Sequence, residues 1–123
     1  MHAGEINSVE NVLQAINYFD ADRIGHCISV VDNDGVLDLL ISRDICVELC
    51  IQSNYLTGGV KKIEQHPVNK FLSKGVPFVI CSDNPSIHAF SLSQEYELFN
   101  RLTQRIDVLD TMNSIQKKYS FSN

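Results

Sequence analysis

Four short segments of the chain carry side chains that can do chemistry. Imidazole and carboxylate groups transfer protons and bind metal ions such as zinc, and nearby hydroxyl and amide groups orient them. Each segment falls where a predicted strand ends: His2–Glu5, His26, Ser53–Asn54 and Asp83–Asn84. Because the carboxyl ends of parallel strands meet at one edge of a sheet, the four segments predict one shared polar site at that edge.

Taken one at a time, these residues have ordinary structural explanations. A histidine near a terminus, such as His2, is commonly exposed, and Glu5 just ahead of a helix favours the helix dipole. His26 in a strand is commonly a core histidine, and Asp83 before an Asn-Pro pair is a typical turn former. Their order and their common placement at strand ends favour a functional site over four unrelated explanations.

The elements that must position these residues alternate between strand and helix. Apolar residues recur at three- and four-residue steps from Ser8, a candidate N-cap, and compact apolar runs indicate strands. The polar stretch 52–55 is typical of a loop or turn, and we expect His88 in the loop after Pro85. Gly75 suits a helix end. We predict helices at 8–19, 36–43, 66–74, 91–102 and 104–119, and strands at 23–27, 45–50 and 76–81, with the end of a further strand at 1–5. Short connections between such elements predict an α/β fold with a parallel sheet.

Composition excludes several classes of protein. The 123 residues are 44% hydrophobic and carry a formal net charge of −5 without a run of Lys or Arg, which argues against nucleic acid or an anionic membrane as partner. The four cysteines stand singly in apolar surroundings, as reduced thiols in a core do. No apolar stretch approaches the roughly 20 residues of a membrane span, and we expect a cytoplasmic protein.

In chain order, the motifs resemble the carboxyl-terminal half of the adenosine deaminase family, within the metal-dependent amidohydrolase superfamily. The resemblance covers essentially the whole chain, so residues 1–123 are interpreted as the second half of one barrel domain. It is carried by these motifs: His2-Ala3-Gly4-Glu5, Arg23-Ile24-Gly25-His26, Glu48-Leu49-Cys50 with Ser53-Asn54 and Leu56-Thr57-Gly58, His66-Pro67, Gly75-Val76, and Ser82-Asp83-Asn84-Pro85.

This resemblance implies a (β/α)8 barrel, of which the chain holds roughly strands five to eight. It also implies zinc-dependent hydrolytic deamination of adenosine or deoxyadenosine to inosine or deoxyinosine, a reaction of purine salvage. His2 and Asp83 match zinc ligands of the family. Glu5 matches the acid that protonates the purine ring nitrogen, and His26 matches the histidine that orients the zinc-bound hydroxide. Gly4 and Asn84 match substrate-binding positions.

The sequence departs from the family pattern at two positions of the site. The family usually has a second aspartate where this chain has Asn84, whose amide keeps one acceptor and adds donors. The family's glycine after the sixth-strand histidine is Cys27 here, which adds bulk beside the site.

A further departure is the missing H-x-H motif, which supplies two zinc ligands in the family. A complete (β/α)8 barrel needs about 250 residues, so this chain accounts for about half of one. We therefore expect full activity to require the missing first half. The expected protein partner is a chain that supplies this half or a second copy of this chain.

Two other functions fit the same residues. The chain can be an inactive α/β module that binds a partner or associates with itself. Alternatively, it can belong to a deaminase of adenine or of another 6-aminopurine. In every enzymatic case the substrate is a small purine molecule.

Overall fold

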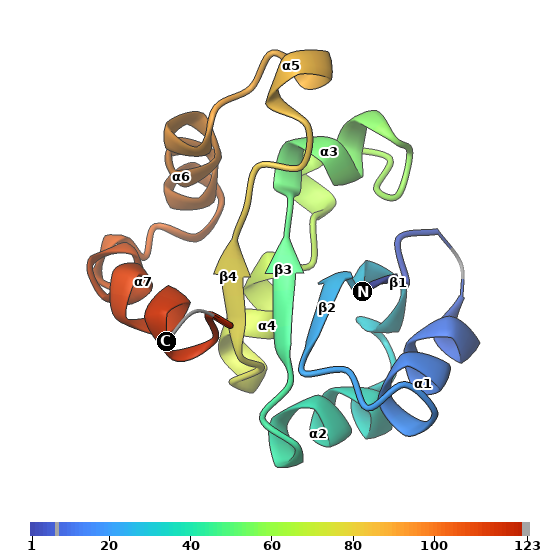
Figure 1. Ribbon diagram of the computed structural model, residues 1–123. Helices are drawn as coiled ribbons and strands as arrows, with labels where there is room; N and C mark the ends of the chain where they lie inside the picture. Colours follow the sequence, from blue (N-terminus) through green and yellow to red (C-terminus); the bar gives the residue numbers. More distant parts are fainter. Residues whose placement is uncertain (7, 122–123) are drawn as a thin grey trace.

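The computed structural model describes residues 1–6 and 8–121 as alternating strands and helices in one body (Figure 1). The elements in chain order are β1 (His2–Ala3), α1 (Val9–Asn17), β2 (Arg23–His26), the 3-10 helix η1 (Ile28–Val30), α2 (Asp34–Ser42), β3 (Cys46–Leu49), α3 (Ile51–Leu56), the 3-10 helix η2 (Ile63–Gln65), α4 (Val68–Lys74), β4 (Phe78–Ile80), α5 (Pro85–His88), α6 (Leu92–Thr103) and α7 (Ile106–Lys118).

The four strands form one parallel sheet in the order β1-β2-β3-β4, which confirms the predicted α/β class. Each strand pairs with the next strand along the chain, because a helix carries the chain back to the start of the sheet. Figure 1 shows α4 behind the sheet, α6 and α7 beside β4, and α3 and α5 beyond the carboxyl ends of the strands.

The two faces of the sheet differ in chemistry. Ile24, Val47 and Phe78 stand in one row across β2, β3 and β4, and all three are at most 6% exposed. In the neighbouring row, His2, Gly25 and Glu48 face the other way, because side chains alternate along a strand. One face is therefore an apolar core surface, and the other carries the polar side chains of His2 and Glu48.

Most predicted elements are confirmed, and their ends are explained by local contacts. The Ser8 hydroxyl accepts a hydrogen bond from the Asn11 amide at 3.2 Å and caps α1. Gly75 ends α4 in the left-handed conformation, with φ +82°. The three predicted strands are present as β2, β3 and β4, each shorter than predicted.

Two predictions for loops are wrong. Residues 52–55 belong to helix α3, although their polar sequence is typical of a turn. His88, expected in a loop, is the last residue of α5, which Asn84 begins as its N-cap. Both helices depend on side chains that cap them, a contribution that apolar periodicity does not reveal.

Gly4 is required where the chain leaves β1. Its φ is +71°, and a Cβ atom there would lie 2.6 Å from Val12 Cγ2 and 2.9 Å from Ser29 Oγ. Glycine adopts this backbone conformation without strain, and its lack of a Cβ atom allows this close approach of α1 and η1 to the end of β1. The packing of Gly4 therefore fixes the direction in which Glu5 enters the site.

We expect Gly4→Ala to lower the free energy of unfolding by about 1–3 kcal/mol more than Gly58→Ala, because of the overlap at position 4. Gly58 is a matched control: its φ is +82°, and a Cβ atom there would meet nothing within 4 Å. Both alanines carry the strain of a left-handed residue, so denaturant unfolding of the two variants isolates the overlap. Equal losses would show that position 4 has room for a side chain.

Candidate active site

The site begins at a strained corner at the end of β2. His26 and Cys27 are consecutive non-glycine residues with positive φ, +71° and +56°. Each costs roughly 1–2 kcal/mol relative to a right-handed residue, and such strain clusters at functional sites. The corner is held because the Cys27 amide donates to the Ala3 carbonyl at 3.0 Å and the Ser29 amide donates to the Gly4 carbonyl at 2.8 Å.

Cys27 serves as core packing at this corner. Its side chain is fully buried, and burial raises the pKa of its thiol to about 12. Cys46 and Cys50 are also buried and Cys81 is partly buried, with thiol pKa values raised by burial, so the prediction of core thiols is confirmed for the first three.

His26 is the centre of the site and is 1% exposed. Its Nε2 lies 2.9 Å from His2 Nδ1 and 3.8 Å from Glu5 Oε2. Burial lowers the pKa of His26; the Glu5 carboxylate opposes this effect, and the neighbouring His2 ring adds to it. A neutral imidazole surrounded by a second imidazole and a carboxylate can orient or transfer a proton at Nε2.

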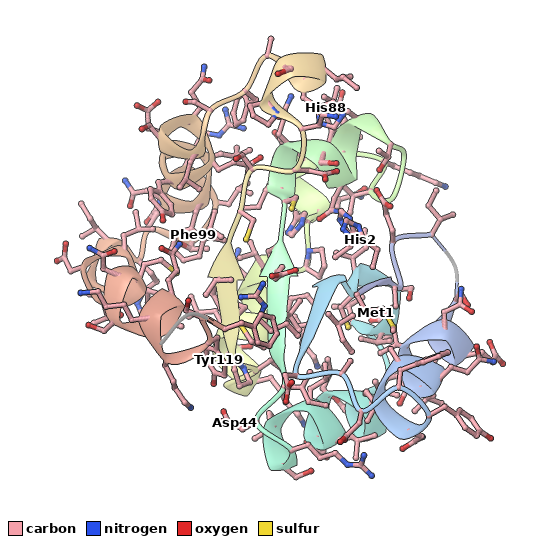
Figure 2. The ribbon with its side chains drawn as sticks, in the orientation of Figure 1. Met1, His2, Asp44, His88, Phe99 and Tyr119 are labelled. Atoms are coloured by element: carbon pink, nitrogen blue, oxygen red, sulfur yellow. The ribbon has the colours of Figure 1, made fainter. Side chains whose placement is uncertain are left out.

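Three of the predicted site residues line one cavity. His2, His26 and Asp83 face a cavity of about 260 Å³, with Glu48 on its wall. Glu5 and Gly4 line an adjoining hollow of about 240 Å³ that shares His2. Figure 2 places His2 below α3 at the carboxyl ends of the strands, with Asp44 and Tyr119 toward the opposite end of the sheet. The structure thus brings His2, Gly4, Glu5, His26 and Asp83 together.

Asn84 is used differently from the other predicted residues. Its Oδ1 accepts a hydrogen bond from the Ile87 amide at 3.3 Å and caps α5, and Asn84 does not line either cavity. The side chain that replaces the family's second aspartate is therefore engaged with the backbone, and its role toward substrate stays a prediction.

Helix α3 positions three of these groups. Its Ser53 hydroxyl donates to Asp83 Oδ2 at 2.8 Å, and its Asn54 Nδ2 lies 2.9 Å from His26 Nδ1. Thr57, at the end of the helix, donates its hydroxyl to Glu5 Oε1 at 2.9 Å. Gly59 closes the loop against Glu5, because a Cβ atom there would lie 2.8 Å from the Glu5 carbonyl oxygen. Sequence reasoning placed Ser53–Asn54 at the shared polar site but treated the stretch as a turn, so it missed the helix that carries them.

His66 extends this network into the core. Its Nε2 lies 3.0 Å from Asn54 Oδ1, and its Nδ1 accepts a hydrogen bond from the Val68 amide at 3.2 Å. The ring is 4% exposed, and burial lowers its pKa to about 4. The prediction that His66 lies near a helix start is confirmed, and its link to the site is an addition.

Glu95, on α6, holds α3 at its amino end. Glu95 Oε2 accepts a hydrogen bond from the Ile51 amide at 3.0 Å, and Oε1 accepts one from the Gln52 amide at 3.1 Å. The side chain is 2% exposed, and burial raises its pKa to about 7 although these two bonds oppose the shift. These bonds satisfy amides that a helix leaves without partners in its first turn.

The donors in the cavity fit zinc in type but not in number. An imidazole and a carboxylate, from His2 and Asp83, are ligands that zinc accepts, and a catalytic zinc site uses three protein ligands. Residues 1–6 and 8–121 contain no group of three or more His, Cys, Asp or Glu placed to hold a metal ion. The remaining ligands of such a site must come from residues outside this set.

The fold and the site define an α/β protein whose histidines and carboxylates meet at the carboxyl edge of a parallel sheet. The chain belongs to the adenosine deaminase family: the model of that family, described as adenosine deaminase, matches residues 1–112. The resemblance inferred from the motifs is therefore confirmed. Within the described part of the chain, every helix is too short or too polar to cross a membrane.

Relatives agree in sequence and in structure. The adenosine deaminase of Serratia proteamaculans (strain 568) is 38% identical over 96 residues, 78% of this chain and 29% of the relative. The apo N6-methyl-AMP deaminase of Arabidopsis thaliana superposes with a TM-score of 0.83 and 27% identity, covering 99% of this chain and 36% of that one. The structure of Arabidopsis ADAL complexed with IMP superposes with a TM-score of 0.84 and 27% identity, covering 99% of this chain and 35% of that one. The chain thus spans about a third of the length of these relatives.

Burial of His66 predicts a pH dependence of stability. Its folded pKa of about 4 lies below its ordinary value of 6.5, so the unfolded chain binds the proton more tightly. The free energy of unfolding should therefore fall as pH decreases from about 6.5 to 4, with roughly 3 kcal/mol of the loss due to His66. In His66→Gln this share of the loss should disappear, as measured by urea unfolding at several pH values.

A measurement near pH 8 serves as the reference for both proteins, because the histidine is then neutral in the folded and unfolded states. It isolates the effect of the substitution on packing. An unchanged difference between wild type and His66→Gln from pH 8 to pH 4 would contradict a buried neutral His66.

A second prediction concerns the cap on α3. Glu95→Gln replaces one of two accepting oxygens by an NH2 group that faces a backbone N–H. We expect a loss of about 1–3 kcal/mol in the free energy of unfolding, because a buried amide loses its acceptor. Glu97→Gln, at an exposed position of the same helix, is the matched control and should change stability by less than about 0.5 kcal/mol. Equal losses of unfolding free energy in Glu95→Gln and Glu97→Gln would contradict the capping role of Glu95.

Proposed function

We propose that this chain forms the carboxyl-terminal part of a zinc-dependent (β/α)8 deaminase that hydrolyses adenosine or deoxyadenosine to inosine or deoxyinosine and ammonia. The observation that carries the proposal is the meeting of His2, Glu5, His26 and Asp83 around adjoining cavities at one sheet edge. The sequential strand order and membership of the adenosine deaminase family support it.

Each residue has a part in this reaction. His2 and Asp83 would hold zinc, which would supply the Lewis acidity that makes water a nucleophile near neutral pH. Glu5 donates a proton to the purine ring nitrogen as water adds to the carbon that bears the amino group, because negative charge builds on that nitrogen. His26 orients the attacking oxygen, and Ser53 fixes the Asp83 carboxylate by its 2.8 Å hydrogen bond. Gly4 and Asn84 contact the substrate.

The proposal requires further residues to complete the barrel and the metal site. Those residues come from a polypeptide that supplies the first four strands, because two ligands from this chain do not make a zinc site. The polar sheet face with the Arg23–Glu48 ion pair, at 3.0 Å, is the surface that such a polypeptide covers.

A related substrate class is a second candidate. The Arabidopsis relative at 27% identity is an N6-methyl-AMP deaminase, which acts on a substituted 6-aminopurine nucleotide. Asn84 faces the backbone of α5 in place of the family's aspartate, which favours a changed contact with the purine. The same site chemistry serves either substrate.

We expect the chain alone to deaminate adenosine negligibly. Activity should appear on co-expression with the amino-terminal part of the Serratia relative, which supplies the missing strands. Release of ammonia from adenosine or adenine, and of methylamine from N6-methyl-AMP, measures both activity and substrate class. Glu5→Gln should lower the rate at least 100-fold, since general acid catalysis contributes roughly 10²–10⁴. Glu10→Gln, exposed on α1, is the control and should keep the rate. A folded complex that releases neither ammonia nor methylamine from any of the three would contradict the proposal.

A further inference from the structure

A buried chain of hydrogen bonds leads from the backbone to the cavity. It runs from the Val68 amide through His66 and Asn54 to His26 and ends at His2, with successive separations of 3.2, 3.0, 2.9 and 2.9 Å. His66, Asn54 and His26 are 4%, 0% and 1% exposed, so water does not compete for these bonds. Each side chain in this series has one donor and one acceptor on its bonded sides. Once the donor at one end is known, the donor and acceptor of every following hydrogen bond are determined.

The fixed end is the backbone. The Val68 N–H can only donate, so His66 Nδ1 must accept, and a neutral His66 then carries its proton on Nε2. That proton points at Asn54 Oδ1, which leaves the Asn54 NH2 group facing His26. His26 Nδ1 must therefore accept from Asn54, and the ring proton of neutral His26 lies on Nε2. The low pKa of His66, lowered by burial, keeps that ring neutral at physiological pH.

We propose that Asn54 and His66 are positioning residues that hold neutral His26 with its proton on Nε2, pointing toward the cavity. In this structure the proton is directed at His2 Nδ1, at 2.9 Å. An oxygen that takes the place of His2 as the partner meets His26 as a hydrogen-bond donor, and the protonated Nε2 cannot take a proton from that oxygen. This inference rests on the proposed function, because it defines how His26 acts on the attacking water. It concerns residues that neither cavity includes, since Asn54 and His66 lie behind His26.

The opposite tautomer is disfavoured by the same geometry. A proton on His26 Nδ1 would face the Asn54 NH2 group at 2.9 Å, so two donors would meet. Rotating the Asn54 amide would remove that conflict but would leave the His66 Nε2 proton facing an NH2 group at 3.0 Å. A buried donor without an acceptor is costly, so both rearrangements are opposed.

The test is the tautomer of His26 in the 123-residue chain labelled with ¹⁵N-histidine. Long-range ¹H–¹⁵N correlation spectra distinguish a protonated ring nitrogen from an unprotonated one. We expect an unprotonated Nδ1 and a protonated Nε2 in His26 and in His66. A protonated Nδ1 in His26 of the wild-type chain overturns the proposal.

Substitutions separate positioning from simple packing. Asn54→Asp keeps an acceptor for His66 but offers His26 a carboxylate oxygen, so Nδ1 of His26 should gain a proton. His66→Phe frees the Asn54 amide to rotate, so a mixture of His26 tautomers should appear, whereas His66→Gln retains a donor to Asn54 and should restore the wild-type signals. An unchanged His26 in folded Asn54→Asp overturns the proposal, as does an unchanged His26 in folded His66→Phe. His88, outside the hydrogen-bond chain, is the internal control.

This measurement needs no turnover, so it fails independently of the deaminase assignment. If His26 is protonated on Nε2 but the complemented complex deaminates none of the substrates, the positioning role stands and the deamination assignment fails. If the complex is active but His26 is protonated on Nδ1, the deamination assignment stands and the positioning role fails. If Asn54→Asp does not fold, the wild-type spectrum and the two His66 variants still decide the proposal.

Discussion

The site depends on the hydrogen bonds by which Glu95 holds the amino end of α3. This six-residue helix is too short to be stable through its own backbone bonds, so contacts with the rest of the fold maintain it. It positions Asp83, His26 and Glu5 through one side chain each, and α6 carries the carboxylate that holds it. The buried Glu95 carboxylate therefore links α6 to three groups of the site through α3.

The strained corner after His26 adds a second constraint. Two consecutive left-handed residues persist because the surrounding hydrogen bonds and the packing of Gly4 and Cys27 over-determine the backbone. In this backbone conformation, the His26 ring contacts His2 with one nitrogen and Asn54 with the other. Backbone strain and the side-chain network thus serve one purpose, which is the orientation of a single imidazole.

Much of this arrangement could be predicted from sequence, and the rest could not for physical reasons. Apolar periodicity and caps such as Ser8 predicted α1, and the placement of His26 and Asp83 at strand ends predicted their convergence, because parallel strands leave little freedom there. Helix α3 was missed because its stability comes from Glu95, which lies 44 residues from Ile51 along the chain. The sequence did not indicate that His66 belongs to the site. His66 is connected to His26 only through hydrogen bonds to Asn54, and neither residue spacing nor composition predicts such an indirect connection.

The contact between His2 and His26 has a consequence for cation binding. With His26 in the proposed tautomer, His2 Nδ1 accepts from His26, and the single proton of a neutral His2 then lies on its own Nε2. A cation that takes the Nε2 lone pair displaces this proton, and a neutral His2 must then carry a proton on Nδ1. Two N–H groups would face each other, so cation binding at Nε2 and the His2–His26 bond are mutually exclusive. Loading of His2 therefore releases the His26 donor for another acceptor in the cavity, with no movement of the backbone required.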